Sequence, residues 1–494
     1  MRLSRTALLA VPALALGLLA PGAASLPHGP LDDILANHDV GQANSYYDHA
    51  FPSTPGTSCD KGSLPEGGVR GRVPLADFTS GRAAKGYTCN ARVVARTGNS
   101  GGFRVERYRD RAGHDCAFYD SSLITGKDAQ KTPVGTYVLD MTNPLKPVRT
   151  AILRSPAMLS PHESLRVSQR SGLLVANMGS PTTQVGFVDV YDVKADCRQP
   201  QIQSTLPLAL LGHEGGFSPD GLTYWATSTG AGGITAIDLR TPTLPKVVWR
   251  STAYVVHGLN ISADGNRAYL AEITNDAAST ILRGGGGLVI LDVSQVQARK
   301  ANPVVREVSE MSWPEVTIPQ NVLPVTIHGH PYAIEFDEFD SNVFTYTPKE
   351  NVGGVHIIDL ADERHPRVVS RIRLPVWDAK ARATSQQDDP GAQGVGQGYA
   401  AHYCNVPSRV DPGLLACSML VSGLRVYDIR DPLHPREVAY ANEPALGDDG
   451  DPIDKGGWAM ASPAFVPERH EIWYSDTASG FYVVRLSPQA WTAR

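Results

Sequence analysis

The sequence predicts one all-β molecule, a seven-bladed β-propeller of four-stranded blades. Three observations predict it: a short motif recurs seven times, each copy lies in a unit of four β-rich runs, and no segment after the N-terminus keeps a 3.6-residue apolar period. Gly and Pro number 47 and 37 of 494 residues, so together they far exceed average use and indicate many turns. A β-sandwich is the alternative, but its strands would not repeat in this register.

The N-terminus indicates secretion. Arg2 and Arg5 precede an apolar stretch over 6–20, and small residues follow at 22–25. This pattern is typical of a cleaved secretory signal, with a membrane anchor as the alternative. We therefore expect a signal peptide over 1–25, an N-terminal extension over 26–66 and the propeller over 67–494. The net charge of −5 indicates no nucleic-acid partner, and no later apolar run is long enough to span a membrane.

The repeated motif is a Gly, four mostly apolar residues, an Asp and a polar turn that often contains Pro. Its seven copies begin at Gly135, Gly186, Gly233, Gly287, Gly354, Gly423 and Gly480. In five copies the Asp stands five residues after the Gly, at Asp140, Asp238, Asp292, Asp359 and Asp428. We expect these carboxylates to hold tight turns by accepting backbone N–H groups.

Two copies carry a family resemblance. The segments GLVILDVS from Gly287 and GLRVYDIRDP from Gly423 resemble the LVIVD-repeat family of secreted or cell-surface propellers. The resemblance covers roughly residues 85–490. It implies the propeller fold and no specific chemistry.

The ring needs a closing strand. The first unit is expected to run through 87–96, 114–120, 135–140 and 148–153, while the last unit has only three β-rich runs. The segment 69–75 (VRGRVPL) is similar to the fourth run of other units, so we expect it to complete the last blade. Such closure would join the two ends of the ring and remove its free edges.

All six cysteines follow the signal segment, and an even number in a secreted chain favours disulfides. Cysteines on neighbouring strands of one blade would lie within bridging range. The strand assignment therefore predicts the pairs Cys89–Cys116 and Cys404–Cys417, and elimination leaves Cys59–Cys197.

Histidines recur at one position of the repeat. Five of them are expected to open the innermost strands of blades two to six: His162, His213, His257, His330 and His402. They would surround one mouth of the central channel. Converging imidazoles suit a transition metal such as copper, iron, zinc or manganese. Glu163 and Glu214 follow two of these histidines and are candidate partners behind the metal ligands, and His328 is a possible additional member of the ring.

Two function classes remain open at this point. One is a metal-dependent extracellular enzyme of oxidoreductase or lyase type, with its site at the channel mouth. The other is a non-catalytic binding or interaction platform for a protein, a cell-wall polymer or a small ligand, in which the histidines pin the structure or line a metal-free mouth. For either function class, we expect a small-molecule or polymer ligand at the channel mouth. The sequence identifies no catalytic residue, substrate or oligomeric state.

Overall fold

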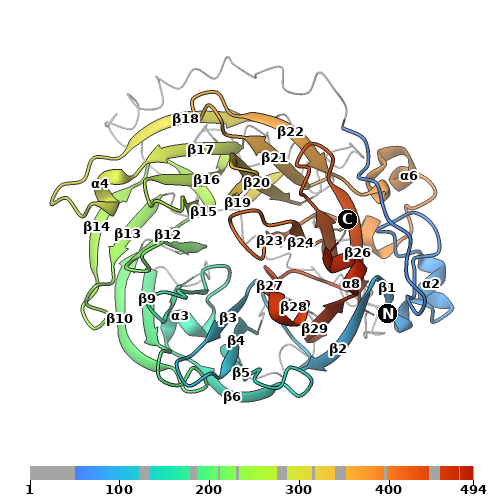
Figure 1. Ribbon diagram of the computed structural model, residues 1–494, viewed down its shortest axis with the longest axis horizontal. Coiled ribbons are helices and arrows are strands. Elements are labelled where there is room, and N and C mark those ends of the chain that lie inside the picture. Colours follow the sequence, from blue (N-terminus) through green and yellow to red (C-terminus); the bar gives the residue numbers. More distant parts are fainter. Residues whose placement is uncertain are drawn as a thin grey trace, which may run out of the picture.

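Seven antiparallel sheets surround one axis, so the predicted seven-bladed propeller is confirmed (Figure 1). The computed structural model describes residues 51–121, 134–178, 186–209, 212–229, 233–274, 286–313, 317–339, 352–393, 398–443, 457–477 and 479–492. The signal segment expected over 1–25 lies outside these residues.

Each blade has its first strand nearest the centre of the ring and its fourth at the rim. Blade one contains β3 (Val105–Arg109), β4 (Asp115–Asp120), β5 (Thr136–Asp140) and β6 (Val148–Leu153), and blade two contains β7 (Arg166–Val167), β8 (Leu173–Asn177), β9 (Gly186–Asp192) and β10 (Gln201–Ala209). Blade three contains β11 (Gly215–Phe217), β12 (Thr223–Thr227), β13 (Ile234–Asp238) and β14 (Lys246–Ser251), and blade four contains β15 (Val255–Ile261), β16 (Arg267–Thr274), β17 (Gly287–Asp292) and β18 (Arg306–Ser312).

Blades five to seven complete the ring. Their strands are β19 (Ile318–Ile327), β20 (His330–Glu338), β21 (Val355–Asp359) and β22 (Arg367–Ile372); β23 (Tyr403–Asn405), β24 (Leu414–Ser418), β25 (Leu424–Asp428) and β26 (Arg436–Asn442); β27 (Ala464–Val466), β28 (Glu471–Asp476) and β29 (Gly480–Leu486) with β2 (Ala91–Thr97).

The apolar run of the motif forms the third strand of each blade. In β17 the residues from Gly287 to Leu291 are all buried, because both faces of a middle strand pack on neighbouring blades. The side chains alternate between two core clusters, with Val289 and Leu291 on the blade-three side and Leu288 and Ile290 on the blade-five side. A strand buried on both faces reads as a continuous apolar run, which is the pattern of the motif.

The prediction that residues 69–75 complete the last blade was wrong. Residues 69–75 form no strand, and β2 pairs with β29 as the fourth strand of the last blade. The run assigned to the first strand of blade one is divided at Asn90, which has a φ of 52°. Its first part, β1 (Tyr87–Cys89), pairs with β26 as a fifth strand of blade six. The first strand of blade one is therefore β3.

The position of β1 in blade six also determines how the cysteines pair. The bond Cys404–Cys417 is confirmed, but Cys89–Cys116 and Cys59–Cys197 were wrong. Cys89 lies on β1, at the edge of blade six, so it cannot reach Cys116 in blade one. The bonds are instead Cys59–Cys89, which ties the N-terminal segment to β1, and Cys116–Cys197, which ties blade one to blade two.

Residues 51–86 run along the outside of blades five and six. The N–H of Thr54 donates to the carbonyl of Arg373, and Glu66 with Glu437 encloses the buried Arg425 guanidinium. Between the strands, the described residues also form short helices: α2 (Leu75–Thr79), η1 (Ala83–Lys85), α3 (Pro156–Leu159), α4 (Ser294–Gln297), η4 (Pro375–Trp377), α6 (Ala379–Ala383), α7 (Pro390–Gln393), η6 (Pro467–Arg469) and α8 (Pro488–Thr492). Within the described ranges, no helix has the length and apolar character to cross a membrane.

Candidate metal centre

Six side chains meet where the innermost strands begin. We call them the axial cluster: His162, Glu163, His213, His257, Glu338 and His402. Four blades supply them directly from the first strand or the residues before it, since His162 and Glu163 precede β7, His213 precedes β11, His257 lies in β15 and His402 precedes β23. Glu338 ends β20, and β20 runs antiparallel to β19, so its last residue returns to the same mouth.

The polar atoms of the cluster are closely spaced. Nε2 of His213 lies 2.9 Å from Nε2 of His257 and 3.1 Å from Oε2 of Glu163. Nε2 of His257 is 3.4 Å from Glu163 and 3.3 Å from Glu338. Nε2 of His402 is 3.5 Å from Glu163 and 3.3 Å from Glu338. With metal–ligand bonds of about 2.1 Å, ligand atoms stand about 3.0 Å apart in an octahedron and about 3.4 Å in a tetrahedron, which matches this spacing.

Backbone carbonyls fix two of the imidazoles. The Nδ1–H of His257 donates to the carbonyl of Gln320 at 3.0 Å, and that of His402 donates to the carbonyl of Met460 at 2.7 Å. A carbonyl can only accept, so each neutral ring turns the lone pair of its Nε2 toward the carboxylates. Lone pairs that face carboxylate oxygens repel one another unless a cation lies between them.

Several cluster atoms are buried without a hydrogen-bond partner. They are Nδ1 of His162, Nε2 of His402 and Oε2 of Glu163. Nδ1 of His162 is 3.8 Å from Oε2 of Glu163. The backbone of His162 has a φ of 51°, a left-handed conformation that a non-Gly residue adopts at a cost. A metal ion would satisfy these atoms together.

Burial and the neighbouring charges shift the pKa values of the cluster in opposite directions. Burial lowers the pKa of His162 to about 3 and, with the neighbouring His257, also lowers the pKa of His213. Burial alone would lower the pKa of His257, but the carboxylates of Glu163 and Glu338 raise it above its ordinary value. Burial would raise the pKa of Glu163, but the adjacent imidazoles hold it well below. The two carboxylates therefore favour the protonated form of His257 when no metal is bound.

A further layer of side chains holds the cluster in place. The amide of Gln320 donates to Oε1 of Glu163 at 2.9 Å, and the ring of Phe103 lies 4.0 Å from that of His162. Arg104 donates to the carbonyl of Glu163 and forms an ion pair with Glu214. Glu214, expected behind the metal ligands, thus pairs with Arg104, and its Oε2 also lies 3.9 Å from Nδ1 of His257.

The structure does not bring His330 or His328 to the cluster. His330 begins β20 at the far end of β19, bonds to Asp359 at 2.8 Å and is 41% exposed. His328 is 76% exposed in the turn between these strands. The sequence spacing suggested that His330 opened the innermost strand of blade five, but that strand is β19, and Gln320 stands near its start.

Sequence reasoning missed Glu338 and Gln320. Both belong to blade five, where the repeat has no histidine at the inner position. Glu338 ends a second strand, whereas the repeated histidines lie at the first strands, so the histidine spacing could not reveal it. Only the pairing of Ile318 with Glu338 brings the carboxylate to the mouth.

Two further groups of side chains have metal-binding residue types. Asp110, His114 and Asp196 lie near the Cys116–Cys197 bond, and a buried group of Glu335, Asp337 and His356 lies within blade five. The second group is occupied internally, since Nδ1 of His356 lies 2.7 Å from Glu335.

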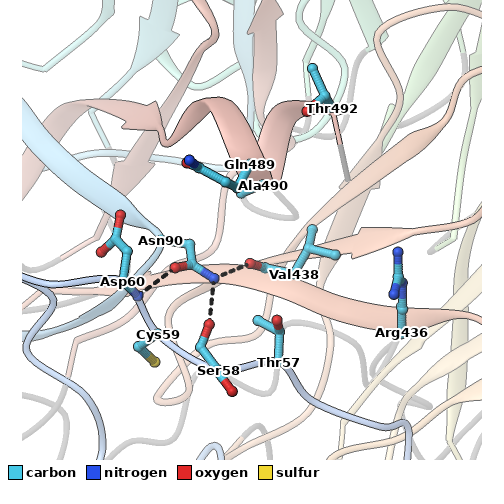
Figure 2. A pocket seen from close by; sticks show the side chains of 10 residues that line it. All are labelled: Thr57, Ser58, Cys59, Asp60, Asn90, Arg436, Val438, Gln489, Ala490 and Thr492. Atoms are coloured by element: carbon cyan, nitrogen blue, oxygen red, sulfur yellow. Dashed lines mark hydrogen bonds between the residues drawn. The ribbon is translucent and has the colours of Figure 1, made fainter. Parts of the chain in front are cut away.

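A surface hollow of about 460 Å³ lies at the rim rather than on the axis. Figure 2 shows Asn90 crossing it, with its amide donating to the carbonyls of Ser58 and Val438 and its oxygen accepting from the N–H of Asp60. These bonds use the amide of Asn90 to hold the N-terminal segment against β26.

Comparisons with known proteins show the fold alone. No family model matches the chain, and no curated protein matches it in sequence. Among solved structures, Kuenenia stuttgartiensis hydrazine synthase is 14% identical with a TM-score of 0.50, over 80% of this chain and 97% of that one. A periplasmic gluconolactonase of Pseudomonas aeruginosa is 13% identical with a TM-score of 0.47, over 72% and 88%. A putative 6-phosphogluconolactonase of Bacteroides uniformis is 10% identical with a TM-score of 0.47, over 74% and 94%.

Proposed function

We propose that this protein binds one transition-metal ion in the axial cluster and acts as a metal-dependent extracellular enzyme. The observation that carries the proposal is the group of imidazole lone pairs and two carboxylates that face one another at 2.9–3.5 Å. His213, His257 and His402 would bind through Nε2, and Glu163 and Glu338 through their carboxylates. His162 would bind through Nδ1 or border the position left for substrate.

The ligand types narrow the choice of metal. Imidazole suits iron, copper and zinc, while carboxylate suits manganese, so a mixed set of up to six ligands favours iron or manganese. Such an ion supplies Lewis-acid or redox chemistry, in line with an oxidoreductase or a lyase. The buried carbonyls of Gln320 and Met460 keep two of the ligand nitrogens aimed inward.

A binding platform is the second candidate. The raised pKa of His257 favours it, because a proton on that imidazole would neutralise part of the carboxylate charge without a metal. The chain would then belong to the LVIVD-repeat propellers as an interaction protein that takes a protein, a wall polymer or a small ligand at its mouth. Either function fits a secreted protein with a cleaved signal, since three disulfides suit an oxidising compartment.

The test is metal binding by matched variants. Chelator-treated protein is incubated separately with Fe(II), Mn(II), Cu(II) and Zn(II), desalted and assayed for metal per chain. We expect one metal per chain in the wild type and in His330→Ala, whose imidazole lies outside the cluster. His257→Ala and Glu338→Gln should bind at least about tenfold more weakly, because each removes a proposed ligand.

Circular dichroism of each variant controls for folding. A wild type that takes up no stoichiometric metal would overturn the proposal in favour of the platform. Equal metal uptake by His257→Ala and the wild type would show that the ion binds elsewhere.

A further inference from the structure

An arginine with no carboxylate partner among the described residues lies at the end of the inner strands opposite the axial cluster. Arg409 lies in the loop between β23 and β24. This loop is fastened to the end of β19, where the N–H of Thr326 donates to the carbonyl of Arg409 and the N–H of Asp411 donates back to Thr326, each at 2.8 Å. The end of β19 and this hairpin lie opposite the strand ends that carry His402 and Gln320.

The side chain of Arg409 reaches two other blades. Its Nη2 donates to Oδ1 of Asn260 in β15 at 3.0 Å, and its Nη1 approaches the carbonyl of Pro324 in β19 at 3.5 Å. Both partners are neutral. Among the described residues, no carboxylate lies within ion-pair distance of this guanidinium, although other channel arginines have one.

The surrounding charge is positive. Arg104 is paired with Glu214, and Nε of Arg166 lies 3.6 Å from Glu106. Arg409 is a third guanidinium beside these two ion pairs, and it has no carboxylate of its own within ion-pair distance among the described residues. Burial and the repulsion of Arg166 and Arg104 together lower the pKa of Arg409 to about 9, yet the group remains charged near neutral pH.

We propose that Arg409 binds a small oxyanion, a phosphate or a carboxylate group, in the channel on the side away from the axial cluster, where the charge of Arg166 also acts. The planar guanidinium fork matches both groups through paired N–H donors. Solvent can reach the edge of the site, since Arg409 is partly exposed and the side chain of Arg166 is 20% exposed. An uncompensated charge of this kind costs stability until an anion offsets it.

Thermal unfolding and calorimetry with inorganic phosphate test the proposal, and malonate serves as the carboxylate probe. Chelated protein is used in a low-salt buffer without either anion. We expect phosphate or malonate to raise the melting temperature of the wild type in a saturable way, with competition if both bind. Arg409→Gln should lose this shift and bind at least about tenfold more weakly, and Arg409→Lys should be intermediate because it keeps the charge without the fork.

Two controls separate this site from the metal centre and from general charge. His257→Ala should keep the anion-induced shift in melting temperature. If the anion instead bound to residual metal in the axial cluster, this variant would lose the shift. Arg111→Gln removes an exposed positive charge and should also keep the shift. The anion-free Arg409→Gln protein should melt no lower than the wild type, which rules out misfolding.

The proposal is overturned if neither anion shifts the wild type, or if Arg409→Gln responds as the wild type does. Metal content provides a separate readout. It should be unchanged in Arg409→Gln, so this site and the axial cluster can fail independently.

Discussion

The aspartate at the end of the third strand holds the following turn in six blades, including blade two, where Oδ1 of Asp192 accepts the N–H of Lys194 at 2.8 Å. Oδ1 of Asp140 accepts the N–H of Thr142 at 2.9 Å, and Oδ1 of Asp359 accepts the N–H of Ala361 at 2.8 Å. The same bond, two residues on, recurs at Asp238, Asp292 and Asp428. This confirms the structural role expected for the repeated aspartate, which a side chain with a short reach can perform locally.

A buried carboxyl group at the channel mouth makes stability depend on pH. Asp120 is 3% exposed and accepts the N–H of Phe103 at 3.0 Å. Burial raises its pKa to about 7 against the effect of that bond. The folded state thus holds a proton that the unfolded state releases near pH 4, so the contribution of Asp120 to stability falls as the pH rises from about 4 to about 7.

Asp120→Asn should remove this dependence. We expect the variant to gain stability over the wild type as the pH rises, by at most about 1.4 kcal/mol per pH unit within that window. Denaturant unfolding at pH 5 and pH 8 measures it. Asp238→Asn is the control, because Arg240 and the turn N–H lower the pKa of Asp238 despite burial. Its contribution to stability changes only below about pH 4, so the difference between Asp238→Asn and wild type should stay constant between pH 5 and pH 8. A constant difference between Asp120→Asn and wild type would contradict the prediction.

The innermost strands are the shortest elements of several blades. β7 has two residues, and β11, β23 and β27 have three each. The residues just before three of these strands supply buried polar groups to the centre, so regular pairing starts only beyond them. Other bonds compensate for the few backbone hydrogen bonds of these short strands. For example, the disulfide between Cys404 and Cys417, which lie opposite each other, joins β23 to β24.

The disulfides should differ in their effect on stability. Cys116–Cys197 closes a separation of 81 residues and Cys404–Cys417 one of 13. Because the loss of loop entropy grows with loop length, replacing the first pair by serines should cost about 1.5 kcal/mol more than replacing the second. Denaturant midpoints of the two double variants measure the difference. A larger loss for the Cys404–Cys417 pair would mean that local order in β23 dominates instead.

Ring closure joins the N-terminal part of the chain to its last blade. β2 pairs along β29 from Ala91 with Leu486 to Thr97 with Phe481. This strand comes from the start of the described chain while β27, β28 and β29 come from its end, so the blade forms only when both are present (Figure 1). Closure therefore makes the seven blades one cooperative unit.

Two truncations should separate closure from the N-terminal segment. A chain that begins at Tyr87 keeps β1 and β2 and should remain a monomeric ring of reduced stability, because it lacks the Cys59–Cys89 bond. A chain that begins at Ser100 lacks β2 and exposes the edge of β29, so it should associate or aggregate. Size-exclusion chromatography and thermal unfolding compare them. Equal behaviour of the two chains would mean that β2 is dispensable.

Sequence periodicity alone determined the blade number, the third strand of each blade and four histidines of the axial cluster. These features repeat locally, so each copy supports the interpretation of the others. The exceptions are residues whose role depends on distant pairing. β2 could not be distinguished from a first strand, because the run 87–96 looks continuous until Asn90 turns it between two blades.

Tertiary structure decided the rest of the site. His330 has the spacing of a cluster residue, but β19 and β20 form a hairpin that carries it to the opposite end. The same hairpin brings Glu338 to the cluster, and the loop after β23 brings the side chain of Arg409 to Asn260 in β15. Contacts between residues 20 to 150 positions apart depend on how strands fold back and how blades face the axis. A local pattern therefore determines which residues form a blade, while the closed ring determines which of their side chains meet.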